Sequence, residues 1–307
     1  MKNAKVIITG PTGAIGVALI NKLIKEKIYV TAVCRRGSLR MGNIPQNEYV
    51  SIIQCDLDEM CKLPEYMGNV EKYDCFFHLA WACTSGDSRN DVGSQIKNIR
   101  YTVDAVEAAV KLGCRRFIGA GSQAEYGRTN EILKPDTPTF PENGYGIAKL
   151  CAGQLSRLRC EQLGIEHIWT RILSVYGPCD GENTLISSLI CKLKNGEHIS
   201  CTKAEQIWDY IYSEDAAEAL FGIMNRGIPG KTYLVASGES YPLNYYIEIV
   251  KNSIDTNANI GYGEIEYSPQ QVMSLRADIS ELNSDIKFTP RTSFFEGIKD
   301  MLSPRCN

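Results

Sequence analysis

Short apolar runs alternate with longer amphipathic segments through the first half of the chain, and this alternation predicts strands separated by helices. Runs rich in β-branched and aromatic residues are typical of strands buried on both faces of a parallel sheet. Longer segments with an apolar stripe predict amphipathic helices, most clearly over 92–112 and 145–163. Because crossovers between parallel strands are right-handed, the series predicts an α/β fold with a Rossmann-type doubly wound sheet. The predicted strands are 6–9, 29–33, 50–54, 75–79, 117–121 and 165–173.

A glycine-rich segment joins the first predicted strand to the first helix. Gly10 permits a tight turn, Gly13 lets the backbone approach a pyrophosphate, and Gly16 lets the helix pack closely. The start of the helix then presents free N–H groups and a positive dipole end to phosphate groups. This strand–glycine–helix order predicts a dinucleotide site rather than a surface turn. The residues expected to bind the cofactor here are Gly10, Thr12, Gly13, Ala14, Ile15 and Gly16.

The alternation breaks after Tyr176-Gly177-Pro178, where the elements become shorter and turn signals more frequent. We therefore expect a dinucleotide-binding Rossmann domain over 1–175. The remainder, 176–307, is predicted to be mainly a smaller α+β cap that binds the substrate. Part of 205–235 is expected to return to the first domain.

The composition narrows the function classes. The 307 residues are 44% hydrophobic and carry a net charge of −3 without a basic patch, so no nucleic-acid partner is expected. No apolar run reaches the roughly 18 residues of a membrane span, and the early first strand leaves no room for a signal peptide. We therefore expect a cytoplasmic protein whose twelve cysteines are reduced. The three histidines lack ligand spacing with cysteine or carboxylate, so no metal site is predicted.

The end of the second predicted strand indicates which cofactor is bound. NAD sites usually carry an acidic residue there for the ribose hydroxyl, but this chain has Cys34 followed by Arg35 and Arg36. Guanidinium groups pair well with a 2′-phosphate, which favours NADP(H) over NAD(H), although NAD(H) stays possible. The alternative is that both arginines are solvated loop charges.

The end of the third predicted strand carries Asp56, followed by Leu57. Asp56 is placed to accept a hydrogen bond from the adenine amino group, and Leu57 is expected beside it. A helix N-cap explains an aspartate at this position nearly as well.

Three residues are candidates for catalysis. Tyr145 and Lys149 lie four positions apart, hence on one helix face, and Ser122 ends the fifth predicted strand. The Lys149 ammonium, the nicotinamide and the helix N-terminus are expected to lower the pKa of Tyr145 by stabilising phenolate. Lys149 would also bind the nicotinamide ribose, and Ser122 would bond the reacting oxygen. Taken alone, the tyrosine–lysine spacing favours a surface pair, but its place on the helix after the fifth strand, behind a strand-end serine and a nucleotide-binding motif, favours catalysis.

These motifs together resemble the extended short-chain dehydrogenases/reductases, the NAD-dependent epimerase/dehydratase family that acts on nucleotide sugars. The resemblance runs nearly end to end. It rests on Thr9-Gly10-Pro11-Thr12-Gly13-Ala14-Ile15-Gly16, His78-Leu79-Ala80-Trp81, 98–102, 122–127, Tyr145 to Lys149, 171–178, and Asp209-Tyr210-Ile211-Tyr212 with Asp215-Ala216.

The resemblance implies further site residues. Leu79 and Ala80 would line the cofactor, while Trp81 and Thr84 would face the sugar. The segment from Ser174 into the cap would meet the nucleotide diphosphate. The family commonly dimerises through the helix pair that includes 92–112, so a homodimer is expected, although a core-facing stripe explains the pattern of that helix equally.

Two departures from the family pattern concern the chemistry. The 4,6-dehydratases carry an Asp-Glu pair after the catalytic hydroxyl residue, whereas this chain has Gln123-Ala124, with Glu125 one place too late. Bifunctional epimerase-reductases carry a cysteine and a histidine, where this chain has Ala124 and Cys179. Neither reaction is therefore expected.

Two more departures concern the diphosphate. Sugar 4-epimerases often carry an arginine where this chain has Trp208, and the family's frequent asparagine is replaced by Ser174. Trp208 would stack on a base or a sugar, and a buried cap aromatic explains it equally. The resemblance then favours NADPH-dependent reduction of a keto group, most simply at C4, on a nucleotide-activated deoxysugar. The alternatives are a C4 epimerase with a retained cofactor and, from another class, a non-catalytic NADP-binding redox sensor.

Overall fold

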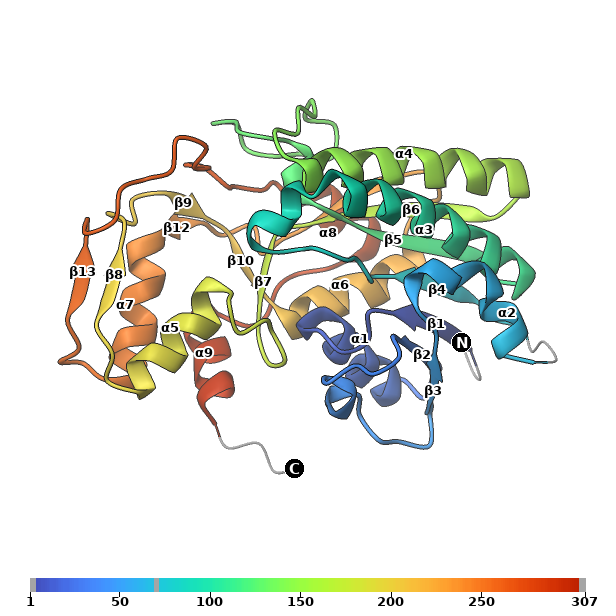
Figure 1. The fold of residues 1–307 in the computed structure, drawn as a ribbon, viewed down its shortest axis with the longest axis horizontal. Coiled ribbons are helices and arrows are strands. Elements are labelled where there is room, and N and C mark those ends of the chain that lie inside the picture. Colours follow the sequence, from blue (N-terminus) through green and yellow to red (C-terminus); the bar gives the residue numbers. More distant parts are fainter. Residues whose placement is uncertain (1–3, 69–71, 304–307) are drawn as a thin grey trace.

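A parallel sheet forms the centre of the molecule (Figure 1). The computed structural model describes residues 4–68 and 72–303, and within them the sheet has seven strands in the order β11-β6-β5-β4-β1-β2-β3. The strands are β1 (Lys5–Thr9), β2 (Tyr29–Cys34), β3 (Val50–Gln54), β4 (Cys75–His78), β5 (Arg116–Ser122), β6 (Glu166–Ile172) and β11 (Thr232–Val235). Every pair in this sheet is parallel, so all carboxyl ends lie along one edge.

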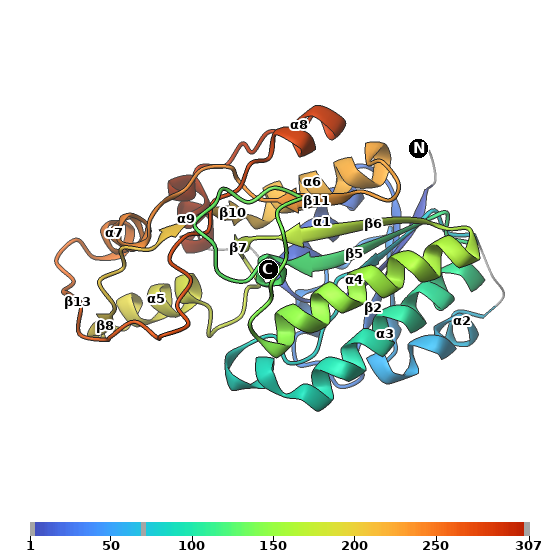
Figure 2. The same cartoon turned by 90° about the horizontal axis from the view of Figure 1, so that it is seen from above.

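Helices cover both faces of the sheet (Figure 2). One face carries α1 (Ala14–Lys25) and α6 (Ser213–Arg226), and the other carries α3 (Val92–Lys111) and α4 (Gly144–Leu163). Each face of the sheet has its own hydrophobic core under these helices. Successive side chains of β1 point to opposite faces, so Val6 and Ile8 pack into one core and Ile7 into the other. Shorter helices on the connections are η1 (Met41–Asn43), η2 (Leu57–Lys62), α2 (Leu63–Tyr66), η3 (Gly86–Asn90) and η4 (Gln123–Glu125).

The predicted Rossmann-type sheet is confirmed, and the six predicted strands differ from the observed ones by at most one residue at either end. The apolar stripe predicted along 92–112 does not coincide with the buried face of α3. Ile96 is 61% exposed, whereas Asn98 and Thr102 are buried. The reason is that polar side chains of α3 hold the chain after β4, where Asn98 bonds both the N–H and the carbonyl of Ala82.

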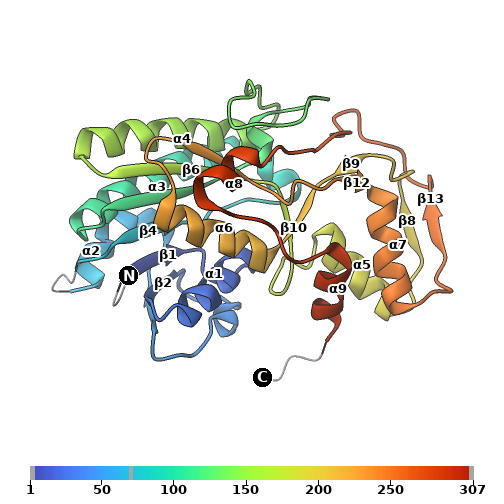
Figure 3. The same cartoon turned by 180° about the vertical axis from the view of Figure 1, so that it is seen from behind.

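The later part of the chain forms a smaller layer beyond the carboxyl ends of the strands (Figure 3). Its strands pair two by two, β7 with β10, β9 with β12, and β8 with β13. From the same part of the chain, α6 and β11 join the central sheet, and α8 packs on both. The bounds are β7 (Ser174–Tyr176), α5 (Leu185–Lys194), β8 (Ile199–Cys201), β9 (Ile207–Trp208), β10 (Tyr210–Tyr212), β12 (Tyr241–Pro242), α7 (Leu243–Ile254), β13 (Ile260–Tyr262), α8 (Ser280–Ile286) and α9 (Phe294–Leu302).

Candidate active site

A cavity of about 500 Å³ lies at the carboxyl ends of the strands β1 to β4. The glycine loop forms one wall, and the ends of β2 and β3 form another. The predicted cofactor residues that line it are Gly10, Thr12, Gly13, Arg35, Asp56, Leu57, Leu79 and Ala80. Ala14, Ile15 and Gly16 do not line it and instead form the first turn of α1 behind the loop.

Each glycine of the loop has its own geometric role. Gly10 has a φ of +72°, and a Cβ there would lie 2.8 Å from the backbone nitrogen of Ala80. A Cβ on Gly16 would collide with the carbonyl oxygen of Gly10, so this glycine lets α1 pack against the turn. Gly13 has open space beside it. The loop therefore fits a dinucleotide pyrophosphate approaching at Gly13.

A buried histidine supports the floor of this cavity. His78 Nδ1 lies 3.0 Å from the Thr9 hydroxyl, which also accepts a hydrogen bond from the Ala80 N–H. Burial, reinforced by the charge of Lys149, lowers the pKa of His78 to about 3. The ring is therefore neutral at neutral pH and acts as a structural link between β1 and β4.

The two arginines after β2 point to different places. Arg35 lines the cavity, but Arg36 does not. The Arg36 guanidinium donates to the Asp56 carboxylate at 3.1 Å and to Glu59, and its backbone N–H donates to Asp56 at 3.0 Å. The expectation that both arginines face the cofactor is therefore corrected to Arg35. The Asp56 side chain caps no helix, because it is engaged by Arg36.

The cavity also contains an arginine that the sequence did not single out. Arg40 lines it and donates from Nη2 to the carbonyl oxygens of Cys179 and Asp180. Those two residues follow β7 in the cap, so Arg40 connects the cofactor cavity with the cap. No local pattern could have found this contact, because it joins segments far apart in the sequence.

The structure brings Ser122, Tyr145 and Lys149 together. Asn143 caps α4 by accepting from the Gly146 N–H at 2.8 Å, which places Tyr145 in the first turn. A Cβ on Gly146 would collide with the carbonyl of Ala124, so this glycine lets α4 approach the end of β5. As a result, the Ser122 side chain lies next to the phenol of Tyr145 and acts to lower its pKa.

Burial raises the pKa of Tyr145, although the Ser122 side chain and the charge of Arg89 act in the opposite direction. The expected lowering by Lys149 is therefore wrong in this structure. The Lys149 ammonium donates to the Ala120 carbonyl at 2.5 Å and lies 5.7 Å from the centre of the Tyr145 ring. Burial lowers the pKa of Lys149 itself to about 7 despite the nearby Glu125.

Trp81 lies beside Tyr145 and Lys149. The Lys149 ammonium is 3.8 Å from the centre of its ring, and the Tyr145 ring meets it edge-on at 6.1 Å. Its indole N–H donates to Gln95 at 3.0 Å, and its side chain lines the cofactor cavity. Thr84 is exposed and lines neither this cavity nor the next one, so its expected place beside a sugar is not supported.

A second cavity of about 370 Å³ lies between η3, the start of α4 and the cap. Trp208 lines it, and Ser174 lies directly behind Trp208. The sequence missed most of its other lining residues, which come from loops without a periodic pattern. The full set of lining residues other than Trp208 is Arg89, Gln123, Ala124, Gly127, Arg128, Glu142, Asn143, Ser268, Gln270, Gln271 and Val272.

The carboxylate nearest to Ser122 is engaged in a buried network. Glu125 is fully buried and accepts from the Ser122 N–H at 2.8 Å, the Trp169 indole at 3.0 Å and the Arg171 guanidinium at 2.8 Å. These three donors fix the Glu125 carboxylate at the end of β5. Glu125 thus holds the end of β5 in place and does not line the second cavity.

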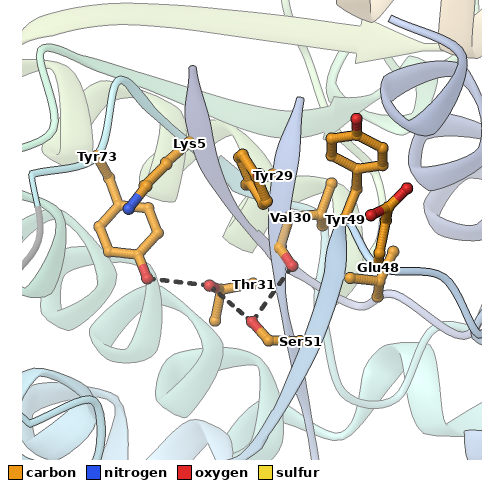
Figure 4. Close-up of a pocket in the computed structure, with 9 residues that line it drawn as sticks. Lys5, Tyr29, Val30, Thr31, Glu48, Tyr49, Ser51 and Tyr73 are labelled. Atoms are coloured by element: carbon orange, nitrogen blue, oxygen red, sulfur yellow. Dashed lines mark hydrogen bonds between the residues drawn. The ribbon is translucent and has the colours of Figure 1, made fainter. Parts of the chain in front are cut away.

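Another hollow, of about 570 Å³, opens at the amino ends of β1, β2 and β3 (Figure 4). Its hydroxyl groups bond to one another, since Thr31 Oγ1 lies 3.0 Å from the Tyr73 hydroxyl and 3.3 Å from that of Ser51. It lies at the opposite end of the strands from Ser122 and Tyr145. Because catalysis in such sheets occurs at the carboxyl ends, this hollow is not the active site.

Within 4–68 and 72–303, no cluster of three or more histidine, cysteine or acidic residues has the geometry to hold a metal ion. In the same residues, no helix combines the length and apolarity needed to cross a membrane.

Comparisons with known proteins agree with this geometry. The model of the NAD dependent epimerase/dehydratase family matches residues 6–236. CDP-abequose synthase of Salmonella muenchen is 26% identical, and dTDP-4-dehydro-6-deoxyglucose reductase of Escherichia coli is 24% identical, each over 98% of both chains. UDP-N-acetylglucosamine 4-epimerase from Methanobrevibacter ruminantium M1, solved in complex with UDP-N-acetylmuramic acid, has a TM-score of 0.86 at 26% identity over 98% of both chains. With its glycine loop, cofactor cavity and Ser122–Tyr145–Lys149 site, the chain belongs to the NAD dependent epimerase/dehydratase family and is an NAD(P)-dependent enzyme of the extended short-chain dehydrogenase/reductase type.

Proposed function

We propose that this enzyme reduces a keto group, most simply at C4, on a nucleotide-activated deoxysugar, with NADPH as the reductant. The observation that carries the proposal is the placement of Tyr145 next to Ser122, beside the second cavity, here called the sugar cavity, to which Gln123 and Ala124 contribute no titratable group. Such a site can give one proton to a carbonyl oxygen. It lacks the additional acid and base at these positions that elimination of water would need.

Tyr145 acts as the general acid. Because burial raises its pKa, the phenol is protonated at neutral pH and ready to donate its proton to the carbonyl oxygen of the sugar. Ser122 orients that oxygen through its hydroxyl. Lys149, fixed by the Ala120 carbonyl, would hold the ribose of the cofactor. The bound nicotinamide cofactor would supply the hydride, while the protein contributes position and electrostatics.

The choice of NADPH rests on the end of β2. Arg35 and Arg40 both line the cofactor cavity, whereas the carboxylate of Asp56 is engaged by Arg36. The guanidinium group of Arg35 favours the additional phosphate of NADP(H). A reductase consumes one NADPH per turnover, so exchange of this cofactor suits the proposed reaction. Among the curated relatives, the Escherichia coli protein is named for a reduction of this kind.

A C4 epimerase that retains its cofactor is the second candidate. The observation that favours it is the likeness to the Methanobrevibacter ruminantium 4-epimerase, at a TM-score of 0.86 and 26% identity. The same three residues would serve oxidation and re-reduction of one sugar. The lack of an arginine at Trp208 and the arginines lining the cofactor cavity favour the reductase.

A homodimer is proposed as the working assembly. The outer sides of α3 and α4 expose large apolar side chains, among them Ile96, Ile147, Leu155 and Leu158. Exposed apolar surface on two neighbouring helices is typical of a subunit interface. Sedimentation of the purified protein tests this assembly, and a monomer at micromolar concentration would contradict it.

The reductase and the epimerase are separated by following the cofactor. The purified protein is assayed for bound dinucleotide and then mixed with NADPH and a 4-keto-6-deoxyhexose linked to dTDP or CDP. We expect substoichiometric bound cofactor and loss of NADPH absorbance that matches product formation. Stoichiometric, tightly held NAD, with interconversion of two sugar epimers and no net change in absorbance, would refute the reductase and support the epimerase.

A further inference from the structure

Arg89 of η3 lies over the catalytic tyrosine. The central carbon of its guanidinium is 4.6 Å from the centre of the Tyr145 ring, and the side chain lines the sugar cavity. Its Nε is buried and has no hydrogen-bond partner among the described residues. A buried donor without a partner is costly, so hydrogen bonds of this Nε within the described residues do not explain where the guanidinium lies.

The position of Arg89 is fixed by the backbone around it. The side chain of Asn90 accepts a hydrogen bond from the Gly144 N–H at 2.9 Å, which docks η3 on the start of α4. A Cβ on Gly144 would lie 3.0 Å from the carbonyl oxygen of Arg89, so the glycine permits this close approach. The same turn of α4 carries Tyr145, and Arg89 is thereby held at the reacting end of the site.

Arg89 and Arg128, the two arginines that line the sugar cavity, differ in the contacts that their guanidinium groups make. Arg128 donates to the Glu142 carboxylate at 2.7 and 3.0 Å and to the Pro269 carbonyl at 2.8 Å. Arg89 instead meets the face of an aromatic ring. Because the five N–H donors of a guanidinium lie in its plane, contact through the face leaves the edge available for acceptors.

We propose that Arg89 is a specificity-determining residue that binds oxygen atoms of the sugar at or next to the reacting carbon. This inference rests on the proposed function and assigns the sugar, rather than the nucleotide, as the group that Arg89 recognises. The planar guanidinium edge suits two neighbouring oxygens, such as a carbonyl and the adjacent hydroxyl, better than the single ammonium of lysine does.

The experiment compares the affinity of a whole nucleotide sugar with that of its nucleoside diphosphate. The protein with bound NADP⁺, which prevents reduction, is titrated calorimetrically with dTDP- or CDP-linked 4-keto-6-deoxyhexose, and separately with dTDP or CDP. Wild type is compared with Arg89→Gln, Arg89→Lys and the matched control Arg115→Gln. Arg115 is an exposed arginine at the amino end of β5 that pairs with Glu166.

We expect Arg89→Gln and Arg89→Lys to weaken binding of the nucleotide sugar by about tenfold or more, as for loss of a charge-assisted hydrogen bond. Affinity for the nucleoside diphosphate should be unchanged in both, and Arg115→Gln should match wild type throughout. A merely structural role would weaken both ligands alike, and that result overturns the inference. So does wild-type affinity of Arg89→Lys for the nucleotide sugar.

Failure of the proposed function has a different signature. In that case wild type itself would bind none of these nucleotide sugars and consume no NADPH with them, and the inference on Arg89 would fall with it. Binding by wild type with an undiminished affinity in Arg89→Gln would overturn the role of Arg89 alone and leave the reductase standing.

Discussion

The indole Nε1 of Trp208 donates a hydrogen bond of 2.7 Å to the hydroxyl of Ser174. These two residues are separate departures from the family pattern in the sequence, and the structure joins them into one unit. The backbone carbonyl of Trp208 also accepts from the Tyr246 hydroxyl at 2.8 Å, so both the indole and the backbone of this residue are held by hydrogen bonds. The short serine supplies both the space and the acceptor that this indole uses.

Tyr145→Phe should lower turnover by about 10²–10⁴-fold, because it removes the general acid. The affinity for NADPH should stay within a few-fold, since the phenol is not the main contact of the cofactor. Steady-state kinetics together with cofactor titration measure both quantities. Near-normal turnover in this variant would show that the assigned mechanism is wrong.

Lys149→Ala is the variant to compare with Tyr145→Phe, because the ammonium of Lys149, unlike the phenol, is expected to contact the cofactor. The side chain is buried and donates to the Ala120 carbonyl at 2.5 Å. We expect both turnover and NADPH affinity to fall in this variant. If only turnover fell, the proposed ribose contact would be wrong.

Arg35→Ala should remove most of the preference for NADPH over NADH. A charge-assisted hydrogen bond to phosphate contributes about 1.5–3 kcal/mol, so the affinity ratio should drop by about tenfold or more. Arg36→Ala is the matched variant, and it should change the ratio less because Arg36 pairs with Asp56 and Glu59. Fluorescence titration with both cofactors tests the pair, and equal wild-type affinities would refute the arginine argument.

No 4,6-dehydratase activity is expected on any hexose nucleotide. Elimination across C5 and C6 needs an acid and a base beyond the tyrosine, and neither Gln123 nor Ala124 can titrate. The carboxylate of Glu125 is held by three donors inside the protein. Mass spectrometry of the products from 6-hydroxy sugars decides the matter, and a 4-keto-6-deoxy product would contradict this assignment.

Stability should fall in mild acid because His167 is buried as a neutral ring. Burial lowers its pKa to about 4, while the unfolded chain titrates near 6.5. Between these values the unfolded state binds more protons, so the free energy of unfolding decreases as the pH falls from about 6.5 to about 4. The full loss is about 3 kcal/mol from this residue.

Urea unfolding of wild type and His167→Gln at several pH values measures this contribution. The glutamine variant should lose less stability than wild type over that interval, because it has no ring to protonate. Parallel stability curves for the two proteins would rule out the contribution of His167.

The sequence predicts the sheet well where the pattern is local. Strands β1 to β6 are short apolar runs, and their bounds follow from those runs alone. For β11 the sequence predicted only that part of 205–235 returns to the first domain, and not the strand itself, whose place in the sheet depends on pairing with β6, far away in the chain. The meeting of Ser122 with Tyr145 was predictable, since both follow from the order of elements in a doubly wound fold.

The features of the site that the sequence did not predict depend on contacts made by loops. Neighbouring arginines 35 and 36 look equivalent in the sequence, and the acidic pair Asp56 and Glu59 from the next connection decides which of them faces the cavity. Arg89 lies in an irregular segment whose position depends on the bond between Asn90 and Gly144. Such contacts arise only after the helices have packed, so the pattern of apolar and polar residues in the sequence does not predict them.

The bond from Arg40 to the carbonyls of Cys179 and Asp180 has a consequence for protein engineering. Attempts to convert cofactor preference normally exchange the residues that follow the second strand. In this enzyme an exchange that included Arg40 would also remove its hydrogen bonds to the loop after β7 in the cap. Redesigning the cofactor site without keeping Arg40 should therefore change which sugars are accepted, so the two specificities have to be redesigned together.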